Sequence, residues 1–309
     1  MIARLAAKDA VRLALVWVAI VSVFAAVNPN FLTLGNMLLI GQSVAIIGIA
    51  AIGVTVAVLS GSVDLSFPAI ISVSTATLAS LLVAGIPELI SLGLVLALGA
   101  ALGASNGLLA RLLRVDALLV TLATYTLLRE GVFIFTRGQT VQAPGNVLAT
   151  LGRGRIDIVP VSLVMLAVVS LGCYIILRWS SKGQGLSAVG DNFGASRLSG
   201  LSAERLQVAA LAASGLLAAV AGAVLTGLIG SASTNNGDAY LLPVLTAVVL
   251  SGASLAGGSG SVAATILAVA VLGTLTNGLN ILRVGPFEQQ MIVGVVLIAG
   301  LLVTAQSRR

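Results

Sequence analysis

Residues 38–59 read LLIGQSVAIIGIAAIGVTVAVL, an uninterrupted run without a charged side chain. A helix that crosses about 30 Å of hydrocarbon needs about 20 predominantly apolar residues. This run meets the requirement, so it predicts a transmembrane helix. Comparable runs recur along the chain, and together they predict an all-α integral membrane protein with a single transmembrane domain over residues 1–309.

About ten such runs are long enough to cross the membrane. The predicted spans are 13–27, 38–59, 65–84, 88–110, 116–135, 158–178, 207–228, 241–256, 261–281 and 287–305. The third and the eighth begin or end at Gly, Pro, Ser or Asp. We therefore expect that either one could be a broken or re-entrant helix.

The composition excludes most soluble classes of protein. Only 8% of the 309 residues are charged and 58% are hydrophobic, whereas a soluble domain carries roughly 25% charged and roughly 45–50% apolar residues. The net charge of +6 does not indicate a nucleic-acid partner, because the 16 Lys and Arg residues are scattered between apolar runs. The predicted environment is membrane lipid.

The scattered basic residues predict the orientation by the positive-inside rule. A cytoplasmic N-terminus places eleven of them inside: Arg4, Lys8, Arg12, Arg111, Arg114, Arg178, Lys182, Arg197, Arg205, Arg308 and Arg309. Four fall outside, namely Arg137, Arg153, Arg155 and Arg283. We therefore expect both termini in the cytoplasm of a bacterial cell, with the chain crossing its inner membrane many times.

Residues with catalytic or metal-binding chemistry are scarce. The chain has one cysteine, Cys173, and no histidine, which excludes an intrachain disulfide and removes the usual ligands of zinc and the usual catalytic bases. The phosphate-binding pattern G-x-x-x-x-G-K-[ST] is absent. The sequence predicts no catalytic residue, no metal site and no cofactor.

Two stretches of the chain resemble each other. LGASNGL at 102–108 precedes LRV at 113–115, and LG at 272–273 precedes NGL at 277–279 and LRV at 282–284. Five predicted spans separate the two copies, so they should point in opposite directions across the membrane. Inverted halves are a frequent plan of transporters, and we therefore predict an inverted repeat.

A carboxylate, Asp64, lies between two apolar runs in the stretch SGSVDLS at 60–66. A charge at the bilayer centre costs about 2.5–3.5 kcal/mol on insertion scales, so it needs a protein or water partner. Asp64 either holds a helix break near the pathway as an ion-paired or capping carboxylate, or simply caps the helix that starts at Leu65. The two hypotheses are compatible.

Other polar side chains within the spans are candidates for the pathway or for packing. Asn106, Asn277 and Asn280 either line a polar pathway or form hydrogen bonds between helices. Thr121, Thr124 and Tyr125 could present hydroxyls to a passing solute, or the two Thr hydroxyls could bond back to their own helix, as is more common. Arg129 and Glu130 are adjacent and are not expected to face each other; they should extend to the outer interface.

The longest hydrophilic stretch predicted inside is the docking segment, about residues 180–206. Between Gly190 and Gly200, Asp191 or Asn192 can cap a short helix that Gly200 ends. Such a helix, lying on the membrane surface, can enter a groove of a soluble partner. The alternative is a plain surface loop.

Several segments, in this order, resemble the permease subunits of ribose-type ABC importers. They are SGSVDLS at 60–66, similar to the family's Gly-Gly-x-Asp-Leu-Ser; Asn106-Gly107; VTL at 120–122; AVGDN at 188–192 with ASRLSG at 195–200; and AVVLSGASLAGGSGS at 247–261. The resemblance covers nearly the whole chain. This family serves monosaccharides and related small solutes, including autoinducer-2.

The resemblance implies partners and a mechanism. Two permease subunits, identical or related, would form the pathway, a periplasmic solute-binding protein would deliver the solute, and two cytoplasmic ABC ATPase subunits would grip the docking segment. ATP binding would then rock the permeases between inward-facing and outward-facing states. The residues that match the family's ATPase-contacting loop are Gly190, Asp191, Asn192, Arg197 and Gly200.

The chain departs from the family pattern at a few positions. Ser62 and Ser251 stand where Gly is usual, Asp116 replaces a common Pro, and YLLP at 240–243 stands where many sugar permeases read Tyr-Glu-Leu. The Leu-Leu-Pro form resembles a subset that includes autoinducer-2, rhamnose-like and polyol permeases. The resemblance therefore leaves the solute open.

The main alternative is a secondary transporter driven by an ion gradient. It would need a coupling carboxylate within the spans, and only Asp64 is a candidate. A membrane-embedded enzyme lacks histidine and an obvious carboxylate pair. An uncoupled channel would not need the docking segment.

Overall fold

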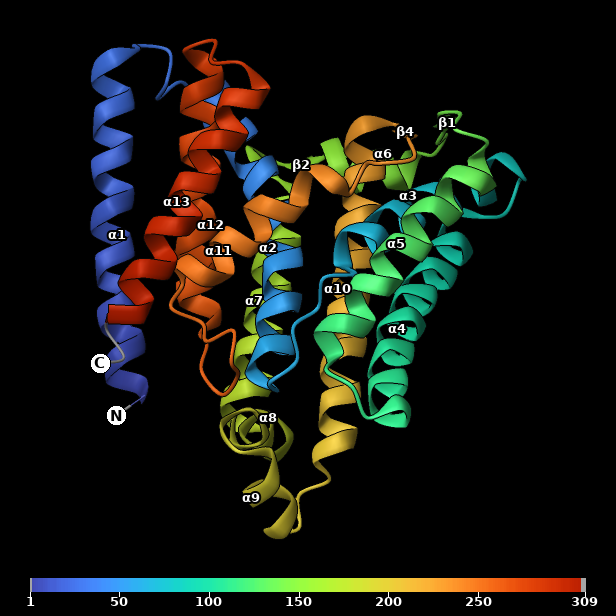
Figure 1. The fold of residues 1–309 in the computed structure, drawn as a ribbon. Helices are drawn as coiled ribbons and strands as arrows, with labels where there is room; N and C mark the ends of the chain where they lie inside the picture. The colour runs from blue at the N-terminus through green and yellow to red at the C-terminus, as the bar shows by residue number, and fades with distance from the viewer. Residues whose placement is uncertain (1, 307–309) are drawn as a thin grey trace.

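The computed structural model describes residues 2–306, and their side chains from Ala10 to Leu302. Its helices are α1 (Ile2–Val27), α2 (Leu34–Leu59), α3 (Phe67–Val83), α4 (Glu88–Leu113), α5 (Ala117–Thr136), α6 (Asn146–Arg153), α7 (Val161–Trp179), α8 (Ser181–Asp191), α9 (Phe193–Leu198), α10 (Ala203–Ile229), the 3-10 turn η1 (Asp238–Tyr240), α11 (Leu241–Leu250), α12 (Val262–Ile281) and α13 (Pro286–Gln306) (Figure 1).

Four two-residue strands form small antiparallel pairs outside the helices. β1 (Val141–Gln142) pairs with β4 (Ser231–Ala232), and β2 (Arg155–Ile156) pairs with β3 (Val159–Pro160). They join loop segments and build no core, so the fold is that of an all-α membrane protein, as predicted.

Seven of the described helices are long and apolar enough to cross a membrane: α1, α2, α4, α5, α7, α10 and α12. Shorter apolar helices cover Phe67–Val83, Asp238–Leu250 and Pro286–Leu302. Each predicted span thus falls on an apolar helix, but the number of crossings, about ten, stays a prediction.

The two spans singled out from the sequence are shorter than their windows. The predicted window 241–256 is wrong at its end, because α11 ends at Leu250 and Gly252 then takes a positive φ of 79°. The window 65–84 begins too early, because the backbone up to Leu65 is not helical and α3 starts at Phe67. Both segments therefore carry a non-helical stretch beside a short helix.

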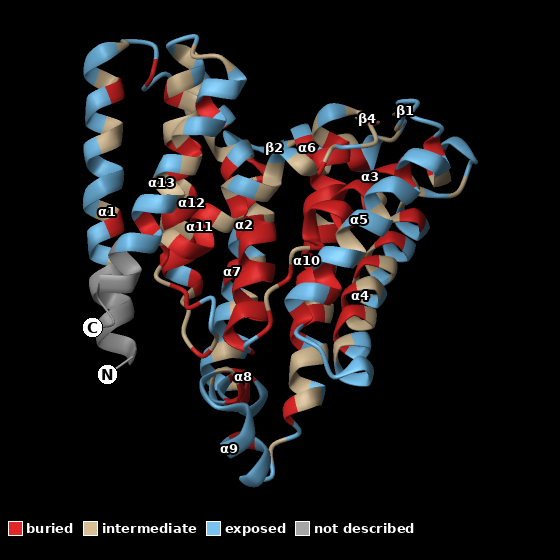
Figure 2. Cartoon of the chain, viewed as in Figure 1, coloured by how far each residue is buried: buried red, intermediate tan, exposed pale blue. Residues whose placement is uncertain are grey.

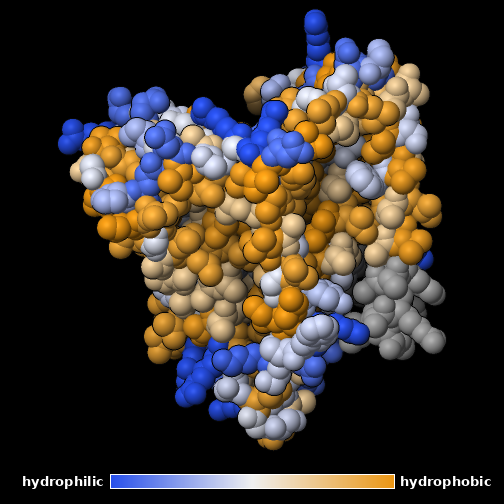
Figure 3. Space-filling model, turned by 180° about the vertical axis from the view of Figure 1, so that it is seen from behind, coloured by the Kyte–Doolittle hydropathy of each residue, from blue (hydrophilic) through white to orange (hydrophobic). Residues whose placement is uncertain are grey.

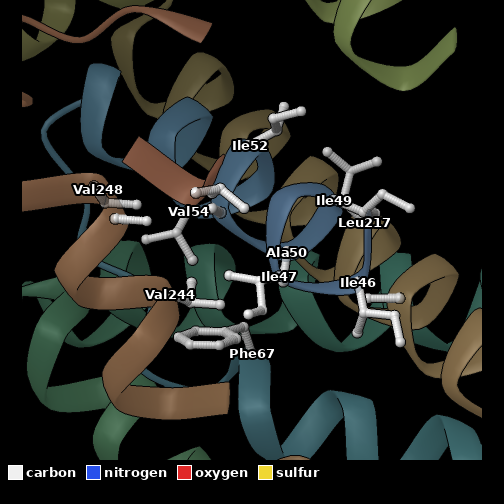
Figure 4. Packing of buried hydrophobic residues seen from close by; sticks show 14 of the residues in the cluster. Ile46, Ile47, Ile49, Ala50, Ile52, Val54, Phe67, Leu217, Val244 and Val248 are labelled. Carbon is white, nitrogen blue, oxygen red and sulfur yellow. The ribbon is translucent and has the colours of Figure 1, made fainter. Parts of the chain in front are cut away.

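The core lies around α2 and α10, which run through the middle of the molecule (Figure 2). In α2, 61% of the most apolar window is buried, and in α10 the share is 67%, against 11% for α1 at the edge. Figure 4 shows how α2 contributes Ile47 and Val54 to a cluster that also contains Phe67 from α3 and Val244 from α11. The two short helices are thus anchored on α2.

A glycine stripe brings α4 and α10 close together. Gly99, Gly103 and Gly107 follow one another at four-residue spacing on α4 and face α10. A Cβ added at Gly103 would lie 2.1 Å from the carbonyl oxygen of Leu211, and one added at Gly215 would lie 2.2 Å from that of Gly99. Small residues that let two backbones approach are typical of helix pairs in lipid.

Polar groups collect at the two ends of the molecule, with an apolar band between them (Figure 3). One end carries α8 and α9, and the other carries α6 and the strand pairs (Figure 1). We call them the α8–α9 end and the α6 end. An apolar band of this kind is the surface expected of a protein immersed in a bilayer.

The two copies of the sequence repeat lie on helices of opposite direction. α4 runs toward the α8–α9 end and α12 runs away from it (Figure 1). Arg114 and Arg283 follow these helices in the left-handed conformation, and the next amide in each case bonds to a carbonyl five residues back. Arg137 after α5 does the same, so this feature does not single out the repeat, which stays a prediction.

Candidate functional site

The chain between α2 and α3, residues 60–66, is not helical although it lies inside the protein; we call it the break segment. Ser60, Ser62, Asp64 and Ser66 within it are buried. Irregular backbone at membrane depth is tolerated only where other groups satisfy its N–H and C=O. On α5, the Thr121 hydroxyl accepts a hydrogen bond from the Leu65 amide at 3.1 Å and lies 3.0 Å from the Val63 carbonyl oxygen.

A buried polar chain ties the break segment to α4 and α5. Asp64 Oδ1 accepts from the amide of Ser66 at 2.8 Å and from its hydroxyl at 2.6 Å. The Ser66 hydroxyl accepts from Asn106 Nδ2 at 2.8 Å, and Asn106 Oδ1 accepts from the Thr124 hydroxyl at 2.7 Å. The chain fixes where the break lies against both helices.

The position of Asp64 corrects one expectation from the sequence. α3 begins at Phe67 with Ser66 as its N-cap, so Asp64 is not the capping residue of a helix from Leu65. No ion pair reaches Asp64 among the residues that the structure describes. Instead, its side chain accepts a hydrogen bond from the backbone amide of Ser66, two residues on, and so closes a turn just before α3. Asp side chains commonly form turns of this type.

Four glycines bring three segments of the chain into contact; we call Gly61, Gly190, Gly257 and Gly258 the glycine junction. A Cβ at Gly190 in α8 would lie 2.2 Å from the Leu59 carbonyl oxygen and 2.4 Å from the Gly258 amide nitrogen. One at Gly257 would lie 2.7 Å from the Cα of Gly61. The end of α8 therefore lies directly on the break segment and on the loop 251–261.

The docking segment folds into two helices rather than the single short one predicted. Asn192 is the N-cap of α9, with its Oδ1 accepting from the Ala195 amide at 2.9 Å. Gly200 follows α9 with φ of 84°. Asp191 is the last residue of α8 and not a cap. The sequence missed α8, whose glycines at 183, 185 and 190 argue against a helix.

Exposed side chains of α9 project from the α8–α9 end. Leu198 is 92% exposed and Phe193 is 38% exposed. Arg197 pairs with Glu204 at 3.6 Å, but its side chain is 70% exposed, so this ion pair adds little stability. The sequence predicted a role for Arg197 but not for Phe193 and Leu198. Exposed apolar side chains are unusual on a surface outside the apolar band, and they mark a candidate contact site.

A polar cavity of about 790 Å³ opens beside the docking segment. Its walls come from the break segment, the turn between α4 and α5, and the starts of α9 and α10, and they include Gly61, Arg111, Arg114, Asp116, Phe193, Arg197, Glu204 and Gln207. Asp116, the residue that departs from the family's proline, caps α5 by accepting from the Leu118 amide at 2.9 Å.

A second polar cluster links α5 to η1, nearer the α6 end. Asp238 accepts from the Tyr125 hydroxyl at 3.0 Å and from Arg129 Nε at 2.9 Å. Arg129 also pairs with Glu130 at 3.3 Å, so the expectation that these neighbours do not meet is wrong: a guanidinium is long enough to reach the adjacent carboxylate. Asp238 could not be linked to this cluster from the sequence, because it lies 109 residues from Arg129.

The remaining predicted amides connect helices. Asn277 on α12 and Asn36 on α2 exchange two hydrogen bonds of 2.8 and 2.9 Å. Asn280 accepts from Gln289 of α13 at 2.8 Å. Neither amide shares a hydrogen bond with the break segment. In the described part of the chain, no three His, Cys, Asp or Glu side chains are grouped to hold a metal ion.

Comparison with known proteins gives a family and several relatives. The family model described as "Branched-chain amino acid transport system / permease component" matches residues 36–301. The chain is 34% identical to the ribose import permease protein RbsC of Escherichia coli (strain K12) over 293 residues, which cover 94% of this chain and 90% of the relative.

Two further relatives are of similar length. The ribose import permease protein RbsC of Bacillus subtilis (strain 168) is 35% identical, with 92% of this chain and 88% of the relative covered. The autoinducer 2 import system permease protein LsrD of Escherichia coli O9:H4 (strain HS) is 33% identical, with 89% and 85% covered. No solved structure matches the chain.

Replacing Gly190 by Ala should separate α8 from the break segment. The added methyl group has no space beside the Leu59 carbonyl and the Gly258 amide, and overpacking of this kind costs about 1–3 kcal/mol. We expect a lower melting temperature for Gly190→Ala in detergent, measured by the intrinsic fluorescence of the two tryptophans. Gly194→Ala in α9 is the matched control, because the nearest atom to its Cβ is at 3.6 Å. Equal melting temperatures for the two variants would contradict the contact.

Proposed function

Because this chain belongs to the family of permease components of branched-chain amino acid transport systems, and its relatives include ribose and autoinducer 2 import permeases, we propose that it is the membrane-spanning subunit of an ATP-binding-cassette importer for a small, polar, sugar-like solute. The observation that carries the proposal is 34% identity to a ribose import permease over 94% of the chain. A protein of this family is a transport subunit and not an enzyme.

The energy must come from a partner, because the chain has no phosphate-binding loop of the P-loop type. Its partners in this proposal are cytoplasmic ABC ATPase subunits, a periplasmic solute-binding protein and a second permease subunit, identical or related. The ion-coupled alternative has no observation in its favour, since the one candidate carboxylate, Asp64, is fully buried and shares hydrogen bonds with packing residues.

The α8–α9 end lies in the cytoplasm in this proposal, as do both termini. The basic residues Arg111, Arg114, Arg178, Lys182, Arg197 and Arg205 belong to this end, whereas Arg137, Arg153, Arg155 and Arg283 belong to the α6 end. The excess of basic residues at the α8–α9 end supports a cytoplasmic location for this end by the positive-inside rule. Arg4, Lys8, Arg308 and Arg309, which the prediction also counted, lie outside the residues whose side chains the structure describes.

The docking segment is the surface that the ATPase contacts. Phe193 and Leu198 provide an exposed apolar tip, and apolar side chains that become buried against a partner contribute free energy in proportion to the area removed from water. The shape of the docking segment around these two apolar residues is set by the end of α8 at Asp191, the cap of α9 at Asn192, the ion pair of Arg197 and the turn at Gly200. Gly190 connects it through the glycine junction to the break segment, so a push on α8 reaches two non-helical segments of the membrane domain.

The pathway runs beside α5 on the face that carries Tyr125 and Arg129. Arg129 lies about 10 Å inside the end of α5, counted at about 1.5 Å per residue. Its side chain and that of Glu130 are half-exposed, and charges at this depth avoid lipid. The face is therefore turned toward a water-filled space or another subunit. Asn106 and Thr121 hold the break in place, and Asn277 and Asn280 pack helices.

We extend the proposal to ten membrane segments in two inverted halves. The opposite directions of α4 and α12 support it (Figure 1). The spacing argues for an imperfect repeat, since eight residues separate Asn106 from Arg114 and six separate Asn277 from Arg283. In such transporters the short, interrupted segments, here α3 and α11, flank the pathway.

The energy source tests the proposed function directly. Cells that carry the chain with its ATPase and binding protein should stop solute uptake when ATP is depleted with the membrane potential maintained. Uptake should continue when an uncoupler collapses the ion gradients while ATP is held constant. The reverse pattern, measured with radiolabelled ribose or autoinducer-2, would identify an ion-coupled carrier instead.

Leu198→Glu should weaken the contact with the ATPase and leave the fold intact, because 92% of Leu198 is exposed. We expect less ATPase in the purified complex and slower uptake, with a normal amount of permease in the membrane. Loss of a buried interface anchor costs roughly 2 kcal/mol or more. Ile156→Glu, at an exposed apolar residue of the α6 end, is the control. Normal ATPase recovery with Leu198→Glu would refute the assigned contact.

Asp238→Asn should alter transport through the α5 face, because it removes the charge that holds Arg129. The guanidinium would then keep only its exposed ion pair with Glu130 and would face the pathway with a less compensated charge. We expect a higher KM for uptake and a normal level of permease–ATPase complex. Glu130→Gln is the control, since its ion pair lies on the same helix. An unchanged KM with Asp238→Asn would place this cluster away from the pathway.

A further inference from the structure

The carboxyl group of Asp64 has one oxygen without a partner at the centre of the protein. Asp64 is fully buried. Its Oδ1 accepts two hydrogen bonds from Ser66, but Oδ2 has no hydrogen-bond partner among the described residues. The buried hydroxyl of Ser214 on α10 lies close enough to this carboxyl group to interact with it. No hydrogen bond joins the two groups in the structure, and the Ser214 hydroxyl has no other partner among the described residues.

Among the residues whose side chains the structure describes, no ion pair reaches the carboxyl group. The recorded ion pairs of the described residues join Arg129 to Glu130, Arg129 to Asp238, and Arg197 to Glu204. On the helices packed around Asp64, the nearest charged residues along the chain are Arg111 on α4, Asp116 and Arg129 on α5, and Arg205 on α10. Each of these charged residues is at least five positions along its helix from the residue that borders Asp64. At about 1.5 Å of rise per residue, five positions correspond to about 7 Å along the helix axis.

A buried carboxylate without a cation is costly, and such a group becomes neutral instead. A protonated carboxyl group can donate one hydrogen bond and still accept others. The Ser214 hydroxyl can donate to an ionised Oδ2 or accept from a protonated one, so the neutral state follows from the buried, cation-free position of Asp64 and not from the pair of oxygens. The two existing bonds to Oδ1 remain possible, because the carbonyl oxygen of a neutral acid still accepts hydrogen bonds, although more weakly than a charged oxygen.

We propose that Asp64 is a positioning residue carried as a neutral carboxylic acid, whose Oδ2–H donates to the Ser214 hydroxyl and ties the break segment to α10. The same segment is tied to α5 by Thr121, to α4 by Asn106 and to α8 by Gly190. The hydrogen bond from the neutral acid to Ser214 would add a contact with the central helix α10.

The variants Asp64→Asn and Asp64→Leu test the proposal. An Asn side chain keeps an acceptor for Ser66 and a donor for Ser214, whereas Leu keeps only the size. We expect Asp64→Asn to retain most of the uptake rate and the melting temperature, and Asp64→Leu to lose both. Ser214→Ala should lower the melting temperature of the parent and of Asp64→Asn, but not lower that of Asp64→Leu further, because the shared bond is already absent there.

Infrared spectroscopy of the purified chain detects the protonation state of the Asp64 carboxyl group directly. The difference spectrum between the parent and Asp64→Asn should contain the carbonyl stretch of a protonated carboxylic acid, unchanged across neutral pH. A carboxylate band in its place would overturn the proposal, as would loss of uptake in an Asp64→Asn variant that reaches the membrane. The uptake assay rests on the proposed function. The infrared result does not, so the two can fail separately.

Discussion

Non-helical backbone inside a membrane protein must find hydrogen-bond partners in the protein, because lipid offers none. Here that requirement falls on the break segment, residues 60–66. The Thr121 hydroxyl of α5 accepts a hydrogen bond from the Leu65 amide, and Asn106 of α4 donates to the Ser66 hydroxyl. Gln207 of α10 donates to the Ser60 carbonyl at 3.1 Å. Three helices are therefore held in place by one short extended stretch, and the rest of the fold is arranged around it.

The glycine junction carries this constraint to the surface. Because Gly190 and Gly257 leave no space for a methyl group and Gly61 leaves only a tight one, a shift of α8 toward the break segment or the loop 251–261 would displace them. Hydroxyls of Thr55, Thr265 and Ser251 extend the contact to α2, α12 and the end of α11. In the proposed importer, an ATPase bound at α9 would therefore act on α8, which contacts the two interrupted segments of the membrane domain.

The apolar runs predicted the helices well, because length and hydrophobicity alone decide whether a segment suits the bilayer. The cap at Asn192 and the stop at Gly200 could also be predicted, since both are local. The sequence could not reveal Asp238 beside Arg129, or the glycine junction, because these contacts join residues that lie far apart along the chain, from 67 positions for Gly190 and Gly257 upward. It also missed α8, where close packing of Gly183 against the Ile176 carbonyl overrides poor helix propensity.

Hydrogen–deuterium exchange in the chain alone and in complex with its ATP-bound ATPase tests the central claim most directly. If the docking segment, the break segment and the loop 251–261 form one mechanical unit, exchange should change in all three when the ATPase binds, with α1 at the edge unaffected. Protection confined to residues 180–206, with residues 60–66 and 251–261 unchanged, would contradict the account.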